Sequence, residues 1–509
     1  MKRYLSYTIL ILFFVSLSSC KKSYLDTAPS DQADIAKIFE NINNVKVALN
    51  GIYRGTYRQY SDQEQDGHPA IMICMDYMGE DVVHTSRGTE YFRGTYQLSD
   101  HYNELNNLPY FAYRMYYAVI ANANLILDRI DTVPDATDKQ KDPIKGECLA
   151  LRAWAHHMLV QLFGSRYVFD GTVRNNTQLG VPIMTTYSTA PQPRATVEQV
   201  YTQINTDLDK AIVLLSNLPS RGLNKTHLDK SVALGLKARV ALTQLNWDDA
   251  AYYALEALKG YSLMSNAQVL DGFSDMKNSE WMWAANQLPE QLPAYGSFYA
   301  YMSANFNSAH TRPNPKKINS YLYGRIANTD IRKKLWCNDV NDYINYPGVI
   351  NASTRESEPS QVRTLLMHKK FVVVDPAVSA GDIPYMRVAE MYLIAAEAKA
   401  RGNRLTEAAE IMKTLGENRD PNYETPDDLN TLLANILIQR RIELWGEGFR
   451  FLDLKRTNVT MSRVSPATGA DLSLINFQSL GSTSGRWQFK IPRRELLANP
   501  YITDKEQNP

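Results

Sequence analysis

The sequence contains few cysteines and almost no net charge. Only 4 of its 509 residues are Cys, and no two are spaced as CxxC or CxxxC. That scarcity argues against a structural zinc site and against a fold held together by disulfides. Lys and Arg number 55 against 54 Asp and Glu, which leaves a formal net charge of +1. Such a small charge cannot concentrate a polyanion at long range, so we do not expect a general nucleic-acid binder.

The common catalytic motifs are also missing. The chain has no P-loop motif, no GxSxG, no HExxH and no GxGxxG after a strand. In residues 481–485, Thr483 stands where a nucleophile elbow needs Ser, so we interpret this segment as a flexible turn. We therefore expect a protein that is not an enzyme and needs no cofactor. A hydrolase is the alternative, and it would need a close pair of carboxylates that sequence spacing cannot demonstrate.

A short acidic segment imitates the start of a calcium-binding loop. Asp62, Glu64 and Asp66 alternate before Gly67, as in the first half of such a loop. The twelfth position, where a bidentate Glu belongs, is Ile73. We therefore predict no metal site. The three acidic residues stay as a weak calcium candidate, and a solvated acidic turn is the preferred interpretation.

The first twenty residues have the proportions of a bacterial lipoprotein signal. Lys2 and Arg3 precede an apolar segment, residues 4–17, whose length of about 14 residues is too short to span a bilayer comfortably. It ends in Leu-Ser-Ser-Cys, which is similar to a lipoprotein cleavage box. We predict a signal peptide over residues 1–19, lipidation of Cys20 and a lipidated polar leader over residues 20–34. A plain secretory signal is the alternative. No later segment approaches 18 uninterrupted apolar residues, so no membrane span is predicted.

Beyond the leader, the pattern is that of a large helical protein. Hydrophobic residues make up 44% of the chain and charged residues 21%, which permits a large core and excludes general disorder. Two strand-like runs cover residues 280–285 and 371–374. Apolar residues that recur every three to four positions predict helices at 108–131, 144–163, 196–218, 230–245, 385–401, 406–415 and 429–446.

An internal repeat indicates the architecture. Residues 238–251 align with residues 396–409, and each segment is interpreted as a helix, a tight turn and a second helix. Small residues stand at the close approaches of both copies: Ala238, Ala250, Ala396 and Ala408. This pattern is typical of tetratricopeptide helical hairpins. We predict a mainly α fold, a single domain over residues 35–509, with such hairpins as scaffold and long irregular insertions at about 61–107 and 263–383.

The two insertions are where we expect a ligand to bind. The 31 tyrosines outnumber the 15 Phe and 7 Trp together, and tyrosine suits wet binding surfaces better than dry cores. Long irregular insertions on a rigid frame usually carry binding residues. The predicted ligand-binding residues are Tyr77, Arg87, Tyr91, Tyr96, Tyr102, Trp281, Tyr295, Tyr299, Asn305 and Tyr321.

The composition of these insertions favours a glycan as ligand. An aromatic ring can cover the C–H face of a sugar, while Asn, Asp and Arg bridge neighbouring hydroxyls. The same residues could hold an extended peptide, with backbone amides in place of hydroxyls. Core packing is the alternative for each aromatic residue, and Trp281 and Trp283 alternate on a strand-like run so that at least one is expected to be buried.

Six sequence blocks, in a fixed order, run along nearly the whole chain. They cover residues 24–29, 117–124, 147–182, 387–398, 440–456 and 491–500. The most distinctive is the block at 440–456, which reads RRIELWGEGFRFLDLKR. Together these blocks resemble the SusD/RagB family of surface nutrient-binding lipoproteins. The charged residues of the blocks, such as Glu443, Arg450, Asp453 and Arg456, have spacings that suit ion pairs at helix ends, so they identify scaffold and not ligand.

The resemblance implies a SusD-like fold and an outer-membrane lipoprotein that binds an oligomeric nutrient without cleaving it. It also implies a partner, a SusC-like TonB-dependent barrel on which the protein would sit as a lid. A glycan is the first ligand class, and an oligopeptide of the RagB kind is the second. A tetratricopeptide-like scaffold for protein assembly is a third possibility. The segment after Cys20, Lys21 to Ser23, lacks the acidic residues that often direct such lipoproteins to the cell surface.

Overall fold

A computed structural model describes residues 35–84, 91–169, 175–218, 224–292, 296–308, 311, 314–342, 345–346, 364–464 and 469–509. Its longer helices are α3 (Ile42–Gly55), α4 (Gly67–Tyr77), α6 (Asn107–Arg129), α7 (Asp138–Phe163), α8 (Val197–Leu214), α9 (Lys230–Thr243), α10 (Trp247–Ala257), α14 (Val388–Arg401), α15 (Leu405–Arg419), α16 (Leu429–Glu443) and α17 (Arg450–Thr457). Its short helices are α5 (Arg93–Tyr96), α11 (Asn266–Val269), α12 (Phe298–Met302), α13 (Ser320–Tyr323) and α18 (Arg493–Ala498).

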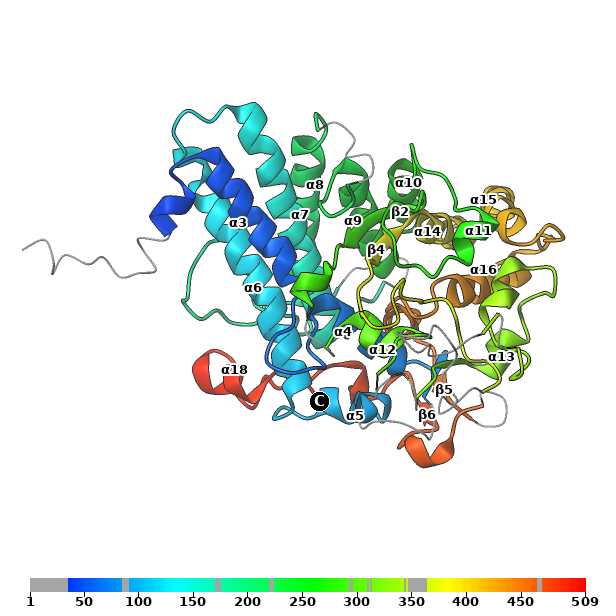
Figure 1. The fold of residues 1–509 in the computed structure, drawn as a ribbon. Helices are drawn as coiled ribbons and strands as arrows, with labels where there is room; N and C mark the ends of the chain where they lie inside the picture. Colours follow the sequence, from blue (N-terminus) through cyan, green and yellow to red (C-terminus); the bar gives the residue numbers. More distant parts are fainter. Residues whose placement is uncertain are drawn as a thin grey trace, which may run out of the picture.

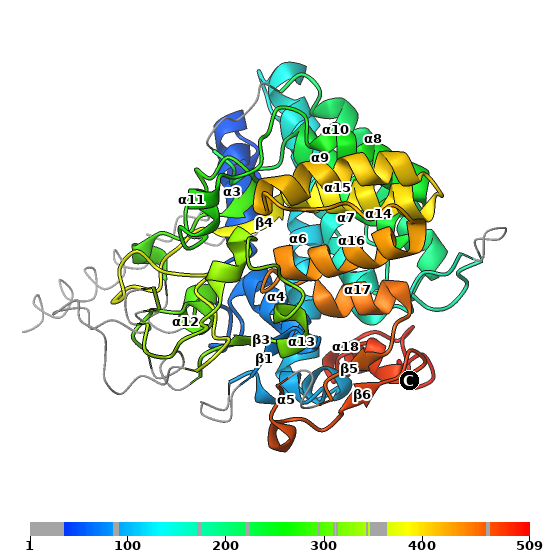
Figure 2. The same ribbon diagram turned by 90° about the vertical axis from the view of Figure 1, so that its right-hand side faces the viewer.

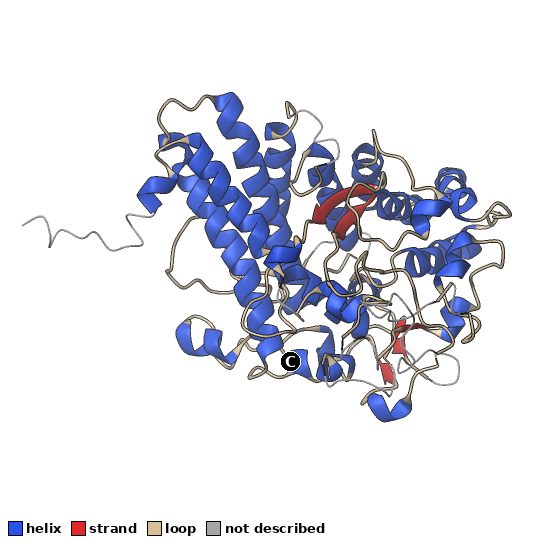
Figure 3. Cartoon of the chain, in the orientation of Figure 1, coloured by secondary structure: helices blue, strands red, loops and turns tan. Residues whose placement is uncertain are grey.

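Strands are few and short, as Figure 3 shows. Within the described residues they form three antiparallel pairs: β1 (Val82–Val83) with β3 (Lys317–Ile318), β2 (Trp281–Ala285) with β4 (Ile383–Arg387), and β5 (Met461–Ser462) with β6 (Ser479–Leu480). The predicted mainly α fold is confirmed. Within the residues listed above, no helix is both long enough and apolar enough to cross a membrane.

The long helices form one continuous stack. In Figure 1, α3, α6 and α7 stand side by side, and α8, α9, α10, α14 and α15 continue the row. Figure 2 shows the other end of the row, where α14, α15, α16 and α17 lie over one another. Helices α4, α5, α12 and α13 of the two insertions lie below this frame together with the C-terminal segment, whereas β2 and α11 of the second insertion lie beside the row. One connected apolar core extends from Phe39 to Ile502, so the insertions pack on the frame and are not separate lobes.

The two repeat copies form equivalent hairpins. Helices α9 and α10 make up the first, and α14 and α15 the second. All four repeat alanines are fully buried, as close helix approach requires. The turns match in detail, because Leu245 and Asn403, which occupy equivalent repeat positions, both take positive φ, 56° and 58°. The next residue of each turn donates its N–H to an equivalent helix carbonyl at 2.9 Å. The helical hairpin repeat predicted from the sequence is confirmed.

Three local predictions were wrong. The helix expected to begin at residue 385 begins at Val388, because residues 383–387 form β4 and pair with β2. The strand expected at 371–374 does not form. The first insertion contains the helix α4, whose residues are all buried. A helix that is buried on every side has no amphipathic period, so α4 could not be predicted from the spacing of its apolar residues.

A buried ion network joins the second insertion to the helical frame. The Arg387 guanidinium contacts Glu280, lies 3.1 Å from Glu443 and makes two bonds of 2.8 and 2.7 Å to Glu447. Arg419 of α15 bridges Glu280 at 2.7 Å and Glu443 at 3.0 Å. All five side chains are at most 5% exposed. Arg387 thus joins β4, and Arg419 joins α15, to Glu280, which precedes β2, and to Glu443, which ends α16.

The network is balanced in charge. Arg332 adds a bond of 2.9 Å to Glu443 and one of 2.7 Å to Asp330, and Lys370 adds one of 2.6 Å to Glu447. Burial alone would raise the pKa of Glu447, but Arg387 and Lys370 outweigh it and hold that pKa below its ordinary value. Four cationic side chains therefore face four carboxylates, and every carboxylate of the network is paired.

Removal of Arg387 should destabilise the protein more than removal of a surface arginine does. The change Arg387→Met keeps the aliphatic stem but leaves four buried carboxylates with only three cations, Arg332, Lys370 and Arg419. It should lower the free energy of unfolding by roughly 3–5 kcal/mol. The control is Arg404→Ala, whose partner Asp248 is 83% exposed, with an expected loss of about 0–1 kcal/mol. Denaturant unfolding of both variants measures the difference. Equal losses would show that the network is not what ties the insertion to the frame.

Candidate functional site

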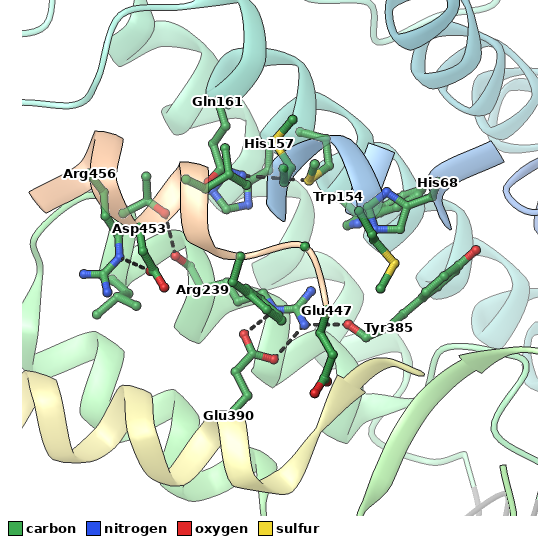
Figure 4. Close-up of a pocket in the computed structure, with 18 of the residues that line it drawn as sticks. His68, Trp154, His157, Gln161, Arg239, Tyr385, Glu390, Glu447, Asp453 and Arg456 are labelled. Atoms are coloured by element: carbon green, nitrogen blue, oxygen red, sulfur yellow. Dashed lines mark hydrogen bonds and ion pairs between the residues drawn. The ribbon is translucent and has the colours of Figure 1, made fainter. Parts of the chain in front are cut away.

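The first cavity lies inside the helical frame (Figure 4). Its volume is about 60 Å³, and His68, Trp154, Arg239, Tyr385 and Glu390 line it among others. Figure 4 shows Arg239 between Glu390 and Tyr385. The guanidinium donates to Glu390 at 2.7 and 2.6 Å and to the Tyr385 carbonyl at 2.5 Å. The cavity has room for a few waters but not for an oligomeric ligand.

The charged groups of this cavity have structural partners. Asp453 accepts from Arg440 and Arg456, each at 2.7 Å. Burial alone would raise the pKa of Asp453, but these two arginines lower it to about 2. Burial lowers the pKa of His68 to about 3, so the imidazole stays neutral at physiological pH. Because the ions satisfy one another, the cavity is part of the scaffold, as the spacing of the 440–456 block predicted.

A second cavity of about 250 Å³ lies within the first insertion, and we call it the first-insertion pocket. Its size is close to the lower limit of ligand pockets, roughly 300 Å³. It is formed by the chain before α4, Cys74 of α4, the helix α5, the 3-10 turn at Asp100–Tyr102 and the start of α6. Its polar lining residues are Asp62, Glu64, Gln65, Arg93, Thr95, Asp100, Asn106 and Asn107, and Phe92 and Phe111 supply apolar wall.

Local hydrogen bonds fix the geometry of the pocket. The Glu64 carboxyl accepts from the N–H of Phe92, a residue with φ of 56°. Asp100 accepts from Thr95 Oγ1 at 3.2 Å and from Asn106 Nδ2 at 3.1 Å. A Cβ on Gly94 would lie 2.1 Å from Asp100 Oδ1, so only glycine admits the carboxylate there. A bulky residue held at positive φ is uncommon, and such backbone often lies at binding sites.

Two of the three pocket carboxyls, Glu64 and Asp100, differ electrostatically from the arginine-paired carboxyls of the scaffold. Burial raises the pKa of Glu64 to about 7, with a further increase from Asp100. Burial also raises the pKa of Asp100. A carboxyl that is partly protonated at neutral pH can both donate and accept a hydrogen bond. Together with carboxamides and a threonine hydroxyl, such groups suit a ligand rich in hydroxyls.

Five of the predicted ligand-binding residues lie in the interior. Tyr77, Tyr96, Trp281, Tyr299 and Asn305 are at most 5% exposed. Tyr77 packs edge-on against Tyr96 with ring centroids 6.1 Å apart, and Asn305 exchanges two bonds of 2.9 Å with the Val373 backbone. In this structure, side chains buried this deeply have no ring face or amide to offer a ligand. Core packing, the alternative considered for each aromatic residue, accounts for their positions.

The other predicted residues are less enclosed or lie outside the described residues. Tyr91 is half-buried beside Tyr301, with ring centroids 5.8 Å apart. Tyr102 is half-buried beneath the Arg486 guanidinium, and Tyr321 is 43% exposed beside Arg325. For these three, ligand contact stays a prediction. Cys20, Arg87 and Tyr295 lie outside the described residues.

The acidic segment at the start of the first insertion does not converge on one point. Asp62 accepts from the N–H of Glu64 at 3.3 Å, and Glu64 is directed to Phe92. Asp66 is buried and accepts from Gln287 and from the Phe298 N–H, both at 3.1 Å. Across the described part of the chain, no three His, Cys, Asp or Glu residues are grouped so that they could hold a metal ion. The weak calcium candidate therefore has no support in the structure.

Most residues that line the first-insertion pocket were not among the predicted ligand-binding residues. Most of the predicted residues are aromatic, whereas the pocket is lined mainly by short polar side chains such as Thr95, Asp100 and Asn106. One signal was available. Asn106 caps α6 by accepting from the Leu108 N–H at 2.9 Å, and an N-cap residue and its polar neighbours lie at the N-terminus of the helix.

The raised pKa of Glu64 predicts a pH-dependent stability. The folded protein holds the Glu64 proton more tightly than an unfolded chain does. The contribution of this proton to folding stability is therefore fully present below pH 4.5 and is lost as the pH rises to about 7. Glu64→Gln has no such loss. Its melting temperature relative to the native protein should rise between pH 4.5 and 7 and then level off. The neutral pocket variant Asn107→Ala should differ from the native protein by a constant amount, and a flat profile for Glu64→Gln would contradict the burial of this carboxyl.

Comparisons with known proteins agree with the fold. The family profile described as "Starch-binding associating with outer membrane" matches residues 23–242, and the profile of the SusD family matches residues 280–507. The SusD-like protein P38 of Formosa agariphila is 23% identical over 561 aligned positions, which cover 100% of this chain and 99% of that protein.

Solved structures share this architecture over nearly the whole chain. A SusD-like carbohydrate binding protein from Bacteroides vulgatus is 26% identical, with a TM-score of 0.79 over 92% of this chain and 99% of that chain. The surface glycan-binding protein A of Bacteroides thetaiotaomicron, solved with laminarihexaose, is 17% identical with a TM-score of 0.67, again over 92% and 99%. Two successive profiles of one family, together with this shared fold, show that the chain belongs to the SusD/RagB family.

Proposed function

We propose that this protein binds a glycan at the outer membrane and delivers it to a SusC-like TonB-dependent transporter. The first-insertion pocket carries the proposal, because its carboxyls, carboxamides and hydroxyl face one cavity within an irregular insertion. Family members are binding proteins, and relatives of the same fold include a carbohydrate binding protein and a protein solved with laminarihexaose. An oligopeptide remains the alternative ligand, since backbone amides can use the same hydrogen-bonding groups.

The arrangement of the pocket explains how a polyol could be held. Asp100 and Asn106 are already bonded to each other at 3.1 Å, so their remaining lone pairs and protons are oriented before a ligand arrives. Glu64 is likewise fixed by the Phe92 N–H. A site whose polar groups are oriented in advance loses less conformational entropy on binding than a mobile one. The rigid frame beneath it keeps these positions constant.

Ligand binding should appear as thermal stabilisation. We expect the soluble form that begins after Cys20 to be stabilised by about 2.7 kcal/mol by a matching glycan present at 100 times its dissociation constant. The double variant Glu64→Gln/Asn107→Ala should bind that glycan at least roughly tenfold more weakly. Asn122→Ala, an exposed asparagine on the same helix α6, is the matched control and should bind normally. Stabilisation by peptides alone would favour the alternative ligand, and unchanged affinity in the double variant would place the site elsewhere.

The proposed membrane attachment rests on the N-terminal segment. Acyl chains on Cys20 would hold the protein at the membrane, since several chains together bind firmly where a single one binds reversibly. The change Cys20→Ser in the full-length protein should therefore move it from the membrane fraction to the soluble fraction. The conservative control Ser19→Ala keeps the thiol and should leave the protein in the membrane fraction. Membrane retention of the Cys20→Ser protein would contradict lipid attachment at this residue.

A further inference from the structure

A third cavity lies beside α17, whose residues Leu454 and Lys455 line it. Its volume is about 140 Å³, and its polar lining comes from Arg166, Lys455, Asn458, Gln488 and the loop at residues 482–484. Figure 2 shows α17 above the β5–β6 pair that precedes this loop. No Asp or Glu is among the lining residues, which distinguishes this cavity from the first-insertion pocket.

Lys455 is the buried cation of the cavity. It is 6% exposed, and its ammonium donates to the Gln161 carbonyl at 2.5 Å and to the Gly164 carbonyl at 2.8 Å. These carbonyls belong to the C-terminal end of α7, whose partial negative charge stabilises the ammonium. An ammonium has three N–H donors, so one remains for the cavity. Burial lowers the pKa of Lys455 to about 7, and no carboxylate raises it.

The remaining lining consists of one more cation and of neutral groups. The half-buried Arg166 guanidinium makes no ion pair with any carboxylate in the described residues. Ser482 and Thr483 supply hydroxyls, and Asn458 and Gln488 supply carboxamides. All of these groups can donate a hydrogen bond. The cavity is therefore lined by two basic side chains and by neutral groups that can donate hydrogen bonds, and no carboxylate of the lining neutralises the basic side chains.

The loop at 482–484 is held in place, although its sequence suggested a flexible turn. Trp487 donates its indole N–H to the Gly481 carbonyl at 2.9 Å, and the ring is buried against Phe451, with centroids 5.1 Å apart. Arg486 donates to the Leu98 carbonyl at 2.7 Å and lies over the Tyr102 ring at 4.2 Å. The hydroxyls of the loop thus have defined positions relative to Lys455.

We propose that this cavity binds a tetrahedral oxyanion of the sulfate or phosphate class. Lys455 and Arg166 would neutralise its charge, and the hydroxyls of Ser482 and Thr483 would donate to its remaining oxygens. The anion can be a free ion or an ester group on a larger ligand, because both present the same oxygens. The proposal does not depend on the function proposed above.

Calorimetric titration of inorganic sulfate and inorganic phosphate into the purified full chain, at constant ionic strength, tests the proposal. We expect saturable binding that weakens at least roughly tenfold in Lys455→Met. Because that change also removes a contact at the end of α7, the double variant Ser482→Ala/Thr483→Ala is measured as well and should show a similar loss. Lys141→Met is the matched control, since Lys141 is a buried lysine that donates to the Asp131 carbonyl away from the cavity.

The outcomes separate the possibilities. Absence of saturable binding to either ion overturns the proposal, and so does binding that the hydroxyl double variant leaves unchanged. Two further titrations identify the source of the anion: an oligosaccharide that carries sulfate esters and its desulfated counterpart. Tighter binding of the sulfated sugar than of inorganic sulfate, lost on desulfation, assigns the site to an ester group. Equal binding of both sugars, with saturable binding of the inorganic ion, assigns it to a free ion.

Discussion

The Glu443 carboxylate at the end of α16 accepts hydrogen bonds from three arginines that are far apart in the chain. Arg332 comes from the second insertion, Arg387 from β4 and Arg419 from the end of α15. Burial alone would raise the pKa of Glu443, but the three guanidinium groups outweigh it and hold the pKa well below its ordinary value. The carboxylate stays ionised in the interior because each of its oxygens is paired.

Such a network constrains the chain more than apolar contacts do. Burying an ion costs several kcal/mol, and only good geometry with opposite charges recovers that cost. An ion that is buried without its partners is strongly destabilising, so the network is stable only when all the segments that supply its ions are in place. Glu280 precedes β2 and Arg387 ends β4, so the network also places the one longer pair of strands on the frame. The second insertion is thus held to the helices by charge as well as by packing.

Two sets of carboxyls in this protein differ in their surroundings. Those of the frame, such as Glu397 and Asp453, are paired with arginines that lower each pKa to about 2. Those of the first-insertion pocket, Glu64 and Asp100, have no such partner, and burial raises each pKa. A carboxyl that lines a cavity and has a perturbed pKa without a structural ion pair is a candidate functional group. This contrast is why we place ligand binding in the first insertion and not in the charged cavity of the frame.

The sequence by itself determined the helical frame, its repeat and the family. Hairpins at 238–251 and 396–409 were predictable because alanine at a close helix approach and an apolar period of 3.6 are local signals. Within the 440–456 block, helical spacing accounts for the Asp453–Arg456 pair. The partners of Glu443 and Arg450 come from distant segments, so spacing could not predict them. Only the tertiary structure decided which polar residues share a cavity, since Glu64, Asp100 and Asn106 meet through chain folding and carry no common spacing. It also decided that Tyr77, Tyr96, Trp281 and Tyr299 belong to the core. Tyr77, Trp281 and Tyr299 lie in α4, β2 and α12, and an element that is buried on every side has no amphipathic period to reveal its position.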